Sequence, residues 1–234
     1  MYYIIYNDIR SADLGVHVAQ RIYIPTGRMR YDDMIIPGQD GTLTQNDEGL
    51  EDIVIPVKLN FLHHGQPGGW QEMLRHIKAW LLEPEGGKLK VSYDPEVFYK
   101  IKRVSIADGN RAGQNAGEIS VEFTAAPYAY YDSGDRFLSP DECKLNPWHE
   151  SRPTYKIMGE GVATLIINGR SIRANVGQNI IIDTDRMLVY REDGTVQNVA
   201  VTGDIGELVL RHGDNSIAIT AGFDLLIQPH WRSL

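Results

Sequence analysis

Three histidines come nearest to a metal-binding cluster in this sequence. His63 and His64 are adjacent, and His76 follows shortly afterwards. Neighbouring residues of an extended segment point to opposite faces, and no cysteine or carboxylate stands at the spacing that a zinc site needs. A solvated turn before a helix is the favoured interpretation. We therefore expect no metal ligand here.

Two carboxylates, Asp183 and Asp185, follow the apolar run Ile180–Ile182. On a strand they would share one face, and a glycosidase uses two carboxyl groups on either side of the bond that it cleaves. Asp-Thr-Asp at the end of a strand is more typical of a turn, because an aspartate side chain accepts hydrogen bonds from the backbone two residues on. The turn is favoured, and an enzyme with a carboxylate pair is the remote alternative.

No other pattern indicates catalysis. The segment Gly109–Gly113 lacks the Gly-Lys-Ser/Thr ending of a phosphate-binding loop. Cys143 is the single cysteine, which excludes an internal disulfide and a cysteine-based zinc cluster, and we expect it to be a structural thiol. The sequence predicts a protein that is not an enzyme, with no catalytic residue, cofactor or metal.

Aromatic residues in the second half suggest one binding function. Trp148, Tyr190 and Trp231 are candidates for stacking on sugar rings. Large aromatic side chains are more often anchors of a core or an interface. Trp231 lies in the closing segment Pro229–Leu234, which we expect to dock on the protein, because a tryptophan buries its large ring only where the chain around it is held in place.

Composition and charge narrow the function classes. Of the 234 residues, 42% are hydrophobic and 23% are charged, as in globular proteins that bury a core. No apolar run reaches the length of a membrane span, and the first residues lack the pattern of a signal peptide, so we expect a soluble protein made in a cytoplasm. The net charge is −5 in residues 1–138 and −3 in residues 139–234, without a basic stripe, so nucleic-acid binding is not expected.

The first half is predicted to be mixed β structure with one helix. Residues 53–61 alternate apolar with mostly polar or smaller side chains, which indicates a strand with one buried face. Apolar residues then recur at helical spacing until Pro84, which predicts a helix over residues 69–83 that packs on a sheet through Trp70, Leu74, Ile77 and Leu81. Further strands are predicted at residues 2–6, 16–24, 88–93, 97–106 and 117–125.

The second half is predicted to be almost purely β. Asn168-Gly169 between apolar runs is a strong hairpin signal, because the tight turn needs a positive φ at both residues. A stretch punctuated by prolines separates the halves, so we predict two domains, residues 1–138 and 139–234, the second an antiparallel β-sandwich of jelly-roll or lectin-like outline. Its strands are predicted at residues 163–167, 171–176, 179–182, 187–190, 196–201, 207–210, 216–220 and 225–228.

One segment is unusual for a surface loop. Residues 26–48 are longer than a typical connection, charged at both ends and apolar at Met34-Ile35-Ile36. Exposed apolar residues promote aggregation unless something covers them, and a neighbouring subunit is the natural cover. We expect this arm to pack on an adjacent subunit through the candidate interface residues Arg28, Arg30, Tyr31, Met34, Ile35 and Ile36.

Several short motifs, taken in order, resemble the distal tail protein family of long non-contractile-tailed bacteriophages, which belongs to the siphophage baseplate or tail tip. The likeness covers nearly the whole chain, and its specificity lies in the order and spacing of the motifs. These are Asp13–Val16, Ile36–Leu43, Ile77–Leu81, Lys88–Asp94, Phe123–Tyr128, Leu165–Gly169, Ile181–Thr184 and Ile227–Arg232.

This resemblance implies a structural protein of the virion tail tip, in a phage or a phage-derived tail particle, assembled in the host cytoplasm. Its N-terminal domain would form a homo-hexameric ring around the tail channel, and a galectin-like C-terminal sandwich would lie outside. The ring would join the tail tube protein and tape measure protein to the tail-associated hub protein, and DNA would only pass through the channel. The alternative function is a carbohydrate-binding adhesion module at the host cell surface.

Overall fold

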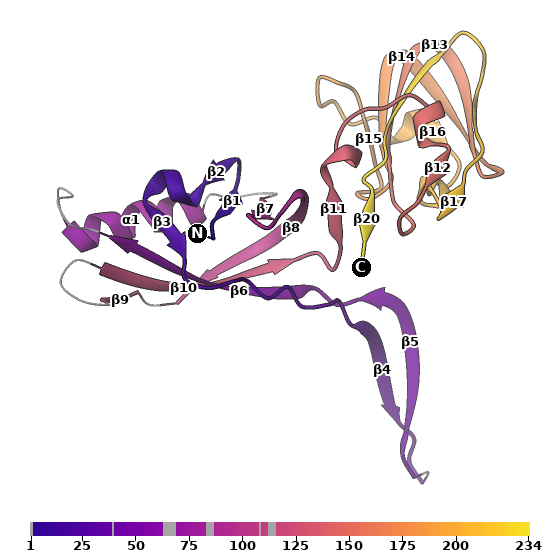
Figure 1. Cartoon of the computed structure of the whole chain (residues 1–234). Coiled ribbons are helices and arrows are strands. Elements are labelled where there is room, and N and C mark those ends of the chain that lie inside the picture. Colours follow the sequence, from indigo (N-terminus) through magenta and orange to yellow (C-terminus); the bar gives the residue numbers. More distant parts are fainter. Residues whose placement is uncertain (1, 39, 63–68, 83–86, 108, 112–115) are drawn as a thin grey trace. The chain divides into compact units, whose positions relative to one another are not determined.

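The computed structural model describes the whole chain except residues 1, 39, 63–68, 83–86, 108 and 112–115 (Figure 1). The protein is mostly β and has one α-helix in the described part of the chain. It divides into two compact units, Met1–Ala129 together with Leu234, and Tyr130–Ser233. The division lies nine residues before the predicted boundary at residue 138, because the segment after Ala129 pairs with the last strand of the second unit.

The first unit is built on an antiparallel sheet with the strand order β2-β1-β7-β8-β10-β6-β3, and β9 pairs with β10. A 3-10 turn, η1 (Ser11–Leu14), connects β2 to β3. The strands of this sheet are β1 (Ile4–Tyr6), β2 (Ile9–Arg10), β3 (Val16–Val18), β6 (Ile53–Leu62), β7 (Lys88–Val91), β8 (Asp94–Ile106), β9 (Asn110–Arg111) and β10 (Ala116–Ala125).

Strand β6 shows how the sequence pattern builds this sheet. Every second residue from Ile53 to Phe61 is buried, as the alternation predicted, and the residues between them point to the opposite face. Val57 lies opposite Val121 of β10 on the buried face, and Ile55 lies opposite Phe123. Only the C-terminal half of β6 pairs with β3, which leaves Pro56 at an open edge, where its lack of an N–H does no harm.

Helix α1 (Gly69–Leu81) covers the buried face of the sheet. Its buried residues recur at helical spacing, and Trp80 Nε1 donates a hydrogen bond of 3.2 Å to the carbonyl of Tyr6. The Tyr6 ring packs in turn on Phe123, with 5.3 Å between ring centroids. Leu74, Ile77 and Leu81 are buried as predicted, whereas Trp70 is half-buried. The helix ends at Leu81; residue 83, its predicted end, lies outside the described residues.

The second unit is built around a long hairpin of β13 (Thr154–Ile167) and β14 (Arg170–Asp183), shown in orange in Figure 1. Asn168 and Gly169 form its turn with φ of 51° and 81°, as the dipeptide predicted. The sheet order is β15-β14-β13-β18, with β16 on β14 and β19 on β13; β12 and β17 form a separate pair. The remaining strands are β11 (Ala129–Tyr131), β12 (Leu145–Asn146), β15 (Leu188–Tyr190), β16 (Val201–Thr202), β17 (Gly213–Asp214), β18 (Ile217–Ile219), β19 (Asp224–Gln228) and β20 (Arg232–Ser233).

One face of the β13–β14 hairpin is buried toward both of its ends, and the burial of β13 is interrupted between Met158 and Val162. Cys143, Leu208, Leu210 and Trp231 cover this face from segments outside the hairpin. The Tyr155 hydroxyl, deep in this core, donates a hydrogen bond of 2.9 Å to the Leu208 carbonyl. The cross-strand pairs on the buried face include Tyr155–Ile182, Ile157–Ile180, Ala163–Ala174 and Leu165–Ile172.

Three strand predictions in this unit need correction. Residues 207–210 form no strand, because a 3-10 turn at Ile205–Glu207, capped by the Asp204 side chain, bends the chain there. Residues 196–201 are interrupted by a second 3-10 turn at Asn198–Ala200. The separately predicted strands at 171–176 and 179–182 are one strand, since β14 continues to pair with β13 through Gln178.

The closing segment docks on the second unit, as predicted. Trp231 is 5% exposed, and its carbonyl accepts a hydrogen bond of 2.9 Å from the Tyr131 N–H. Arg232 is also buried, and its Nε donates to the Glu150 carbonyl at 2.6 Å. A Cβ at Gly134 would collide with the backbone nitrogen of Trp231, so only glycine fits beneath this segment.

Candidate functional site

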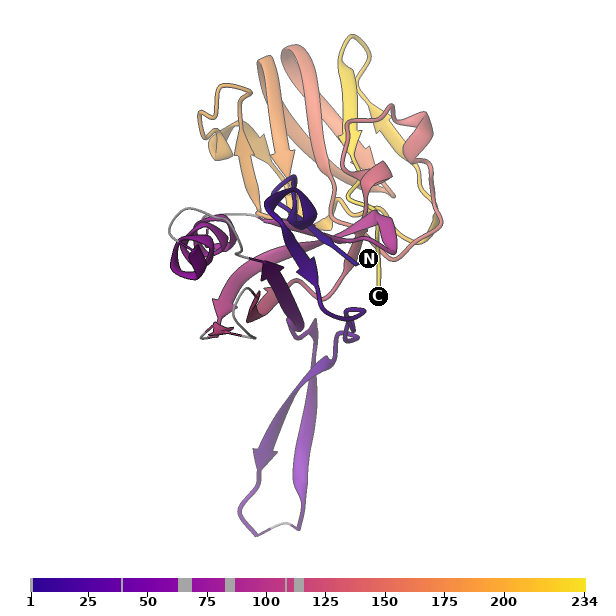
Figure 2. The same cartoon turned by 60° about the vertical axis from the view of Figure 1, so that its left-hand side comes forward.

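The most exposed element of the first unit is a two-stranded antiparallel hairpin, β4 (Met29–Ile35) and β5 (Thr42–Leu50), which we call the arm. Within the described part of the chain, these strands pair only with each other. The arm extends away from the sheet of its own unit in both views (Figures 1 and 2). The long loop expected over residues 26–48 is therefore wrong in its local structure, since most of the segment is paired strand.

Cross-strand pairing gives the arm two distinct faces. Glycines Gly38 and Gly41 bend its tip with φ of 82° and 88°, values that L side chains adopt at a cost. Partners directly opposite each other share a face. One face carries the pairs Met34–Leu43 and Asp32–Gln45, and the other carries Ile35–Thr42 and Asp33–Thr44, in which the Thr44 hydroxyl donates to the Asp33 carboxylate at 2.6 Å.

The arm is closed at its base. The Glu51 N–H donates a hydrogen bond of 2.8 Å to the Arg28 carbonyl, so the two chain ends of the arm lie side by side. Arg30 Nη2 donates to the Leu50 carbonyl at 3.3 Å, where the strand register shifts between Met29 and Tyr31. The arm is therefore connected to the rest of the first unit through a narrow junction, formed by Arg28 and Glu51.

The arm exposes apolar side chains on both faces. Ile35 is 81% exposed, Leu43 is 52% exposed and Met34 is 47% exposed. A two-stranded hairpin that buries neither face is marginally stable in water, and contiguous exposed apolar residues typically mark an interaction surface. The six residues predicted for a subunit interface are all exposed, and their part in an interface remains a prediction: Arg28, Arg30, Tyr31, Met34, Ile35 and Ile36.

The arm also concentrates charge. Residues 1–129 contain 13 basic and 17 acidic residues, and residues 29–50 account for one of the basic and five of the acidic ones. The remainder of the first unit has twelve of each sign and no net formal charge. The arm is thus acidic as well as apolar.

The three aromatic residues proposed for sugar stacking have different surroundings. The Trp231 ring belongs to the core of the second unit, which corrects its prediction as a sugar platform, because a buried ring offers no face to a ligand. Trp148 is half-buried and stacks on Tyr131, with ring centroids 4.0 Å apart, so one of its faces is occupied. Tyr190 lies half-buried in β15, where burial raises the pKa of its hydroxyl. Sugar stacking by Trp148 and Tyr190 remains a prediction.

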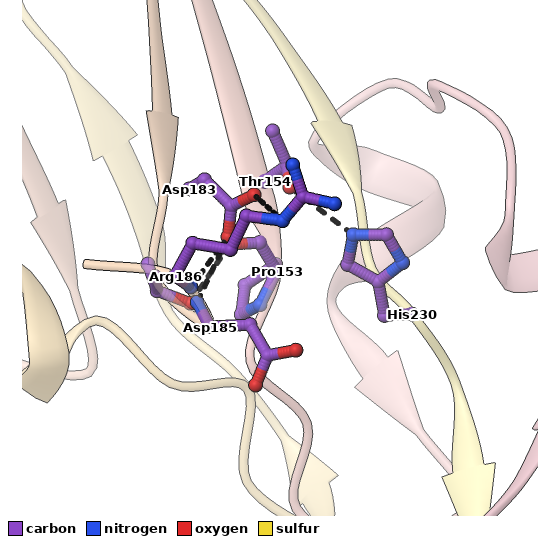
Figure 3. A network of polar contacts seen from close by, with 7 residues as sticks. Pro153, Thr154, Asp183, Asp185, Arg186 and His230 are labelled. Carbon is purple, nitrogen blue, oxygen red and sulfur yellow. Dashed lines mark hydrogen bonds and ion pairs between the residues drawn. The ribbon is translucent and has the colours of Figure 1, made fainter. Parts of the chain in front are cut away.

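Asp183 and Asp185 form a turn, which was the favoured interpretation. Asp183 Oδ1 accepts hydrogen bonds from the backbone N–H groups of Asp185 at 3.0 Å and Arg186 at 2.9 Å. The Arg186 guanidinium lies 3.8 Å from the other oxygen of the same carboxylate. The Asp185 carboxylate points away from this network (Figure 3), so the two carboxyl groups do not face a common substrate position. Thr184 fixes the turn by donating to the Pro153 carbonyl at 2.8 Å.

The other candidates for chemistry are placed as follows. His63 and His64 lie outside the described residues, and His76 is exposed on α1. Among the described residues, no three histidine, cysteine, aspartate or glutamate side chains gather as a metal site would require. Cys143 is buried, and burial raises the pKa of its thiol to about 12, as expected for a structural cysteine. None of the helices in the described ranges is both long and apolar enough to cross a membrane.

Sequence reasoning missed one member of the arm surface. Leu43, directly opposite Met34, was not among the interface candidates. The glycines at 38 and 41, between apolar residues on either side, are a hairpin signal that would have paired the two.

Comparisons with known proteins bear on the fold. Neither a protein-family model nor a curated protein matches the sequence. The fold of the chain does match a solved structure: the crystal structure of SPP1 Dit (gp 19.1), described as a paradigm of the hub adsorption apparatus in phages that infect Gram-positive bacteria. The match covers 97% of this chain and 97% of that chain, with a TM-score of 0.64 and 11% sequence identity. The chain is therefore similar in fold to Dit over nearly its whole length.

Proposed function

We propose that this protein is a structural component of a phage tail tip that assembles into a homo-hexameric ring through its arm. The observation that carries the proposal is the arm itself, an apolar and acidic hairpin that its own unit leaves uncovered. The likeness in fold to SPP1 Dit, along almost all of both chains, supports the tail-tip role. The arm would be covered by the adjacent subunit of the ring.

The proposed ring also assigns roles to the neighbouring tail proteins and to the second unit. It would connect the tail tube protein and the tape measure protein on one side to the tail-associated hub protein on the other. DNA would pass through its channel without being gripped, consistent with a net charge of −8 and the absence of a basic stripe from the sequence. The second unit would lie outside the channel, and no catalytic step is assigned to either unit.

Removing the arm tests this proposal. Because the Arg28 carbonyl and the Glu51 N–H are hydrogen-bonded, an Asn-Gly turn replacing residues 29–50 closes the chain without strain. We expect the full-length protein to sediment at about six times the 26.3 kDa of the chain and the armless variant to sediment as a folded monomer. Analytical ultracentrifugation gives the mass, and circular dichroism verifies the fold.

A milder variant shows whether the apolar side chains of the arm, rather than its backbone, hold the ring together. The triple substitution Met34→Ser, Ile35→Ser and Leu43→Ser is expected to weaken the ring, whereas the control Val199→Ser, on the most exposed apolar residue of the second unit, leaves it intact. Full-length protein that remains monomeric at every concentration contradicts the ring. An armless variant that still runs at ring mass contradicts the role of the arm.

A further inference from the structure

A surface groove on the first unit offers cationic and apolar side chains to an acidic, apolar arm. The groove, of about 300 Å³, lies between the segment 20–23 and the outward-facing residues of β6 and β10. Pro56 and Lys58 of β6 pair with Glu122 and Ser120 of β10 along its floor. This face of the sheet is the one that helix α1 does not cover, because α1 packs on the buried residues of the same strands.

The rim of the groove is held in place by contacts of the neighbouring segment. The Tyr93 hydroxyl donates a hydrogen bond of 2.6 Å to the Ile22 carbonyl, and the Arg21 guanidinium lies 4.6 Å from the centre of the Tyr93 ring. Between these anchored residues and the strand, Tyr23 is 75% exposed. The groove thus offers a fixed cation, Arg21, beside an uncovered aromatic ring.

Lys58 supplies a second positive charge at the groove. Its Nζ lies 3.9 Å from the Glu118 carboxylate, and both side chains are more than a third exposed. An exposed ion pair at that distance contributes little to stability, so Lys58 can exchange Glu118 for an incoming carboxylate at small cost. Glu122 lines the groove and Glu118 lies beside Lys58, so these two carboxylates balance Arg21 and Lys58. The attraction for an acidic arm therefore depends on Arg21 and on an exchange of Glu118 for an arm carboxylate at Lys58.

The arm presents the complementary groups on one face. Asp32 lies beside the exposed apolar pair of Met34 and Leu43, and the alternate positions of the strands bring them to the same side. Six copies of an arm with a net charge of −4 repel one another, so an arrangement in which each arm meets cations is favoured.

We infer that the Asp32–Met34–Leu43 face of one subunit's arm docks in this groove of the next subunit. The carboxylate of Asp32 meets Arg21 and Lys58, and Met34 and Leu43 cover Tyr23 and Pro56. This inference rests on the proposed ring and identifies the surface that receives the arm.

The occupant is a second copy because the arm cannot reach the groove of its own chain without reversing. Strand β6 leads from the base of the arm at Ile53 into its own sheet, and the arm runs away from that sheet in both views (Figures 1 and 2). Met34 lies six residues from Arg28, about 20 Å along an extended strand. An arm on one side and a groove on another make a head-to-tail contact, which closes into a ring when the rotation per subunit permits.

Charge reversal followed by charge exchange tests the inference. Reversing the groove with Arg21→Glu and Lys58→Glu, or reversing the arm with Asp32→Lys, is expected to weaken ring association about tenfold or more. The variant that carries all three changes restores the attraction with the signs exchanged, so it should regain most of the lost association. The control reverses the same residue types on the helix, Arg75→Glu and Lys78→Glu, and should assemble like the unmodified protein.

The outcomes distinguish this inference from the ring on which it rests. Dissociation is measured by sedimentation velocity at several salt concentrations, and unchanged melting of each variant shows that the units are folded. If both reversed variants still form rings, the proposed ring is retained, but the groove is not the surface that receives the arm. That conclusion holds whether the groove binds another partner or none. Failure of the triple variant to regain association also overturns the pairing. If the unmodified protein forms no ring, the proposed function itself is contradicted, and with it the docking of the arm in the groove.

Discussion

The protein contains two long antiparallel hairpins that differ in what covers them. The β13–β14 hairpin of the second unit pairs without a break over fourteen residues on each strand, and one of its faces is buried. The arm of the first unit has a shift in register near its base, and every residue of β4 is exposed. The first hairpin contributes one face to a core, whereas the second is exposed within the described part of the chain.

This difference shows that strand pairing alone does not decide the role of a hairpin. Backbone hydrogen bonds contribute little net free energy in water, and the burial of apolar side chains supplies most of the stability. The β13–β14 hairpin gains that burial within its own unit. The arm does not gain that burial within the described part of its own unit, so under the proposed function its stability would be coupled to assembly.

The largest expected effect comes from removing the cover of the β13–β14 hairpin. Trp231→Ala is expected to lower the free energy of unfolding of the second unit by about 3–5 kcal/mol, because a large buried ring is lost and a cavity remains. Urea denaturation followed by circular dichroism measures this. Trp148→Ala, at a half-buried site, should cost less. Equal stability of the Trp231 variant and the unmodified protein would show that the closing segment does not support the hairpin.

The same substitution in each hairpin sharpens the comparison. Leu165→Ala, at a fully buried site of β13, is expected to cost about 2–5 kcal/mol, whereas Leu43→Ala in the arm should change the stability of the folded monomer by about 0.5 kcal/mol or less. The Leu43 variant should instead weaken ring formation. If the two substitutions lower the free energy of unfolding of the monomer equally, Leu43 is buried within the monomer and the arm is not an exposed hairpin.

The smallest expected effect concerns the reactivity of cysteine thiols at pH 8. Cys143 packs in the core beneath the β13–β14 hairpin and should resist a thiol reagent at pH 8 until the unit unfolds. A cysteine introduced at the exposed Met34 of the arm should react at once in the monomer and more slowly in the ring. Fast reaction of Cys143 in the native protein would contradict its burial.

Raising the pH extends this test. The pKa of Cys143 rises from 9.0 to about 12 on folding, so the folded state binds the thiol proton more tightly than the unfolded state does. This contribution to stability is present in full below pH 9 and is lost as the pH rises toward 12. The second unit should therefore melt at lower temperature as the pH increases over this range, and Cys143→Ala should reduce the slope. A slope unchanged by the substitution would assign the effect to other groups.

The sequence predicted well those elements whose side chains are sorted between a buried and an exposed face. Strand β6, helix α1 and the Asn168-Gly169 turn all carry such local signals, and the structure confirms them. The turn at Asp183 was also predicted, since its hydrogen bonds span only a few residues.

The sequence could not show features that depend on contacts between residues far apart in the chain. It also could not show a hairpin whose faces are not buried within the chain. The strands of the arm lack an alternating pattern because neither face is buried within the chain, so the segment was expected to be a loop. The prolines predict a boundary near residue 138, whereas Tyr131 and Leu138 already form backbone hydrogen bonds with Trp231 and Ile227 at the other end of the second unit. The groove beside Arg21 joins segments far apart in the sequence, and no local pattern indicates it.

The narrow junction between Arg28 and Glu51 makes the length of the arm adjustable. Side chains alternate along a strand with a period of two, so adding two residues to each strand would lengthen the arm by about 7 Å and leave each face unchanged. The sheet of the first unit would not have to change, because it meets the arm only through the hydrogen-bonded ends. If the arm joins subunits as proposed, insertions at this single hairpin would change the spacing between subunits and, with it, the width of the proposed channel.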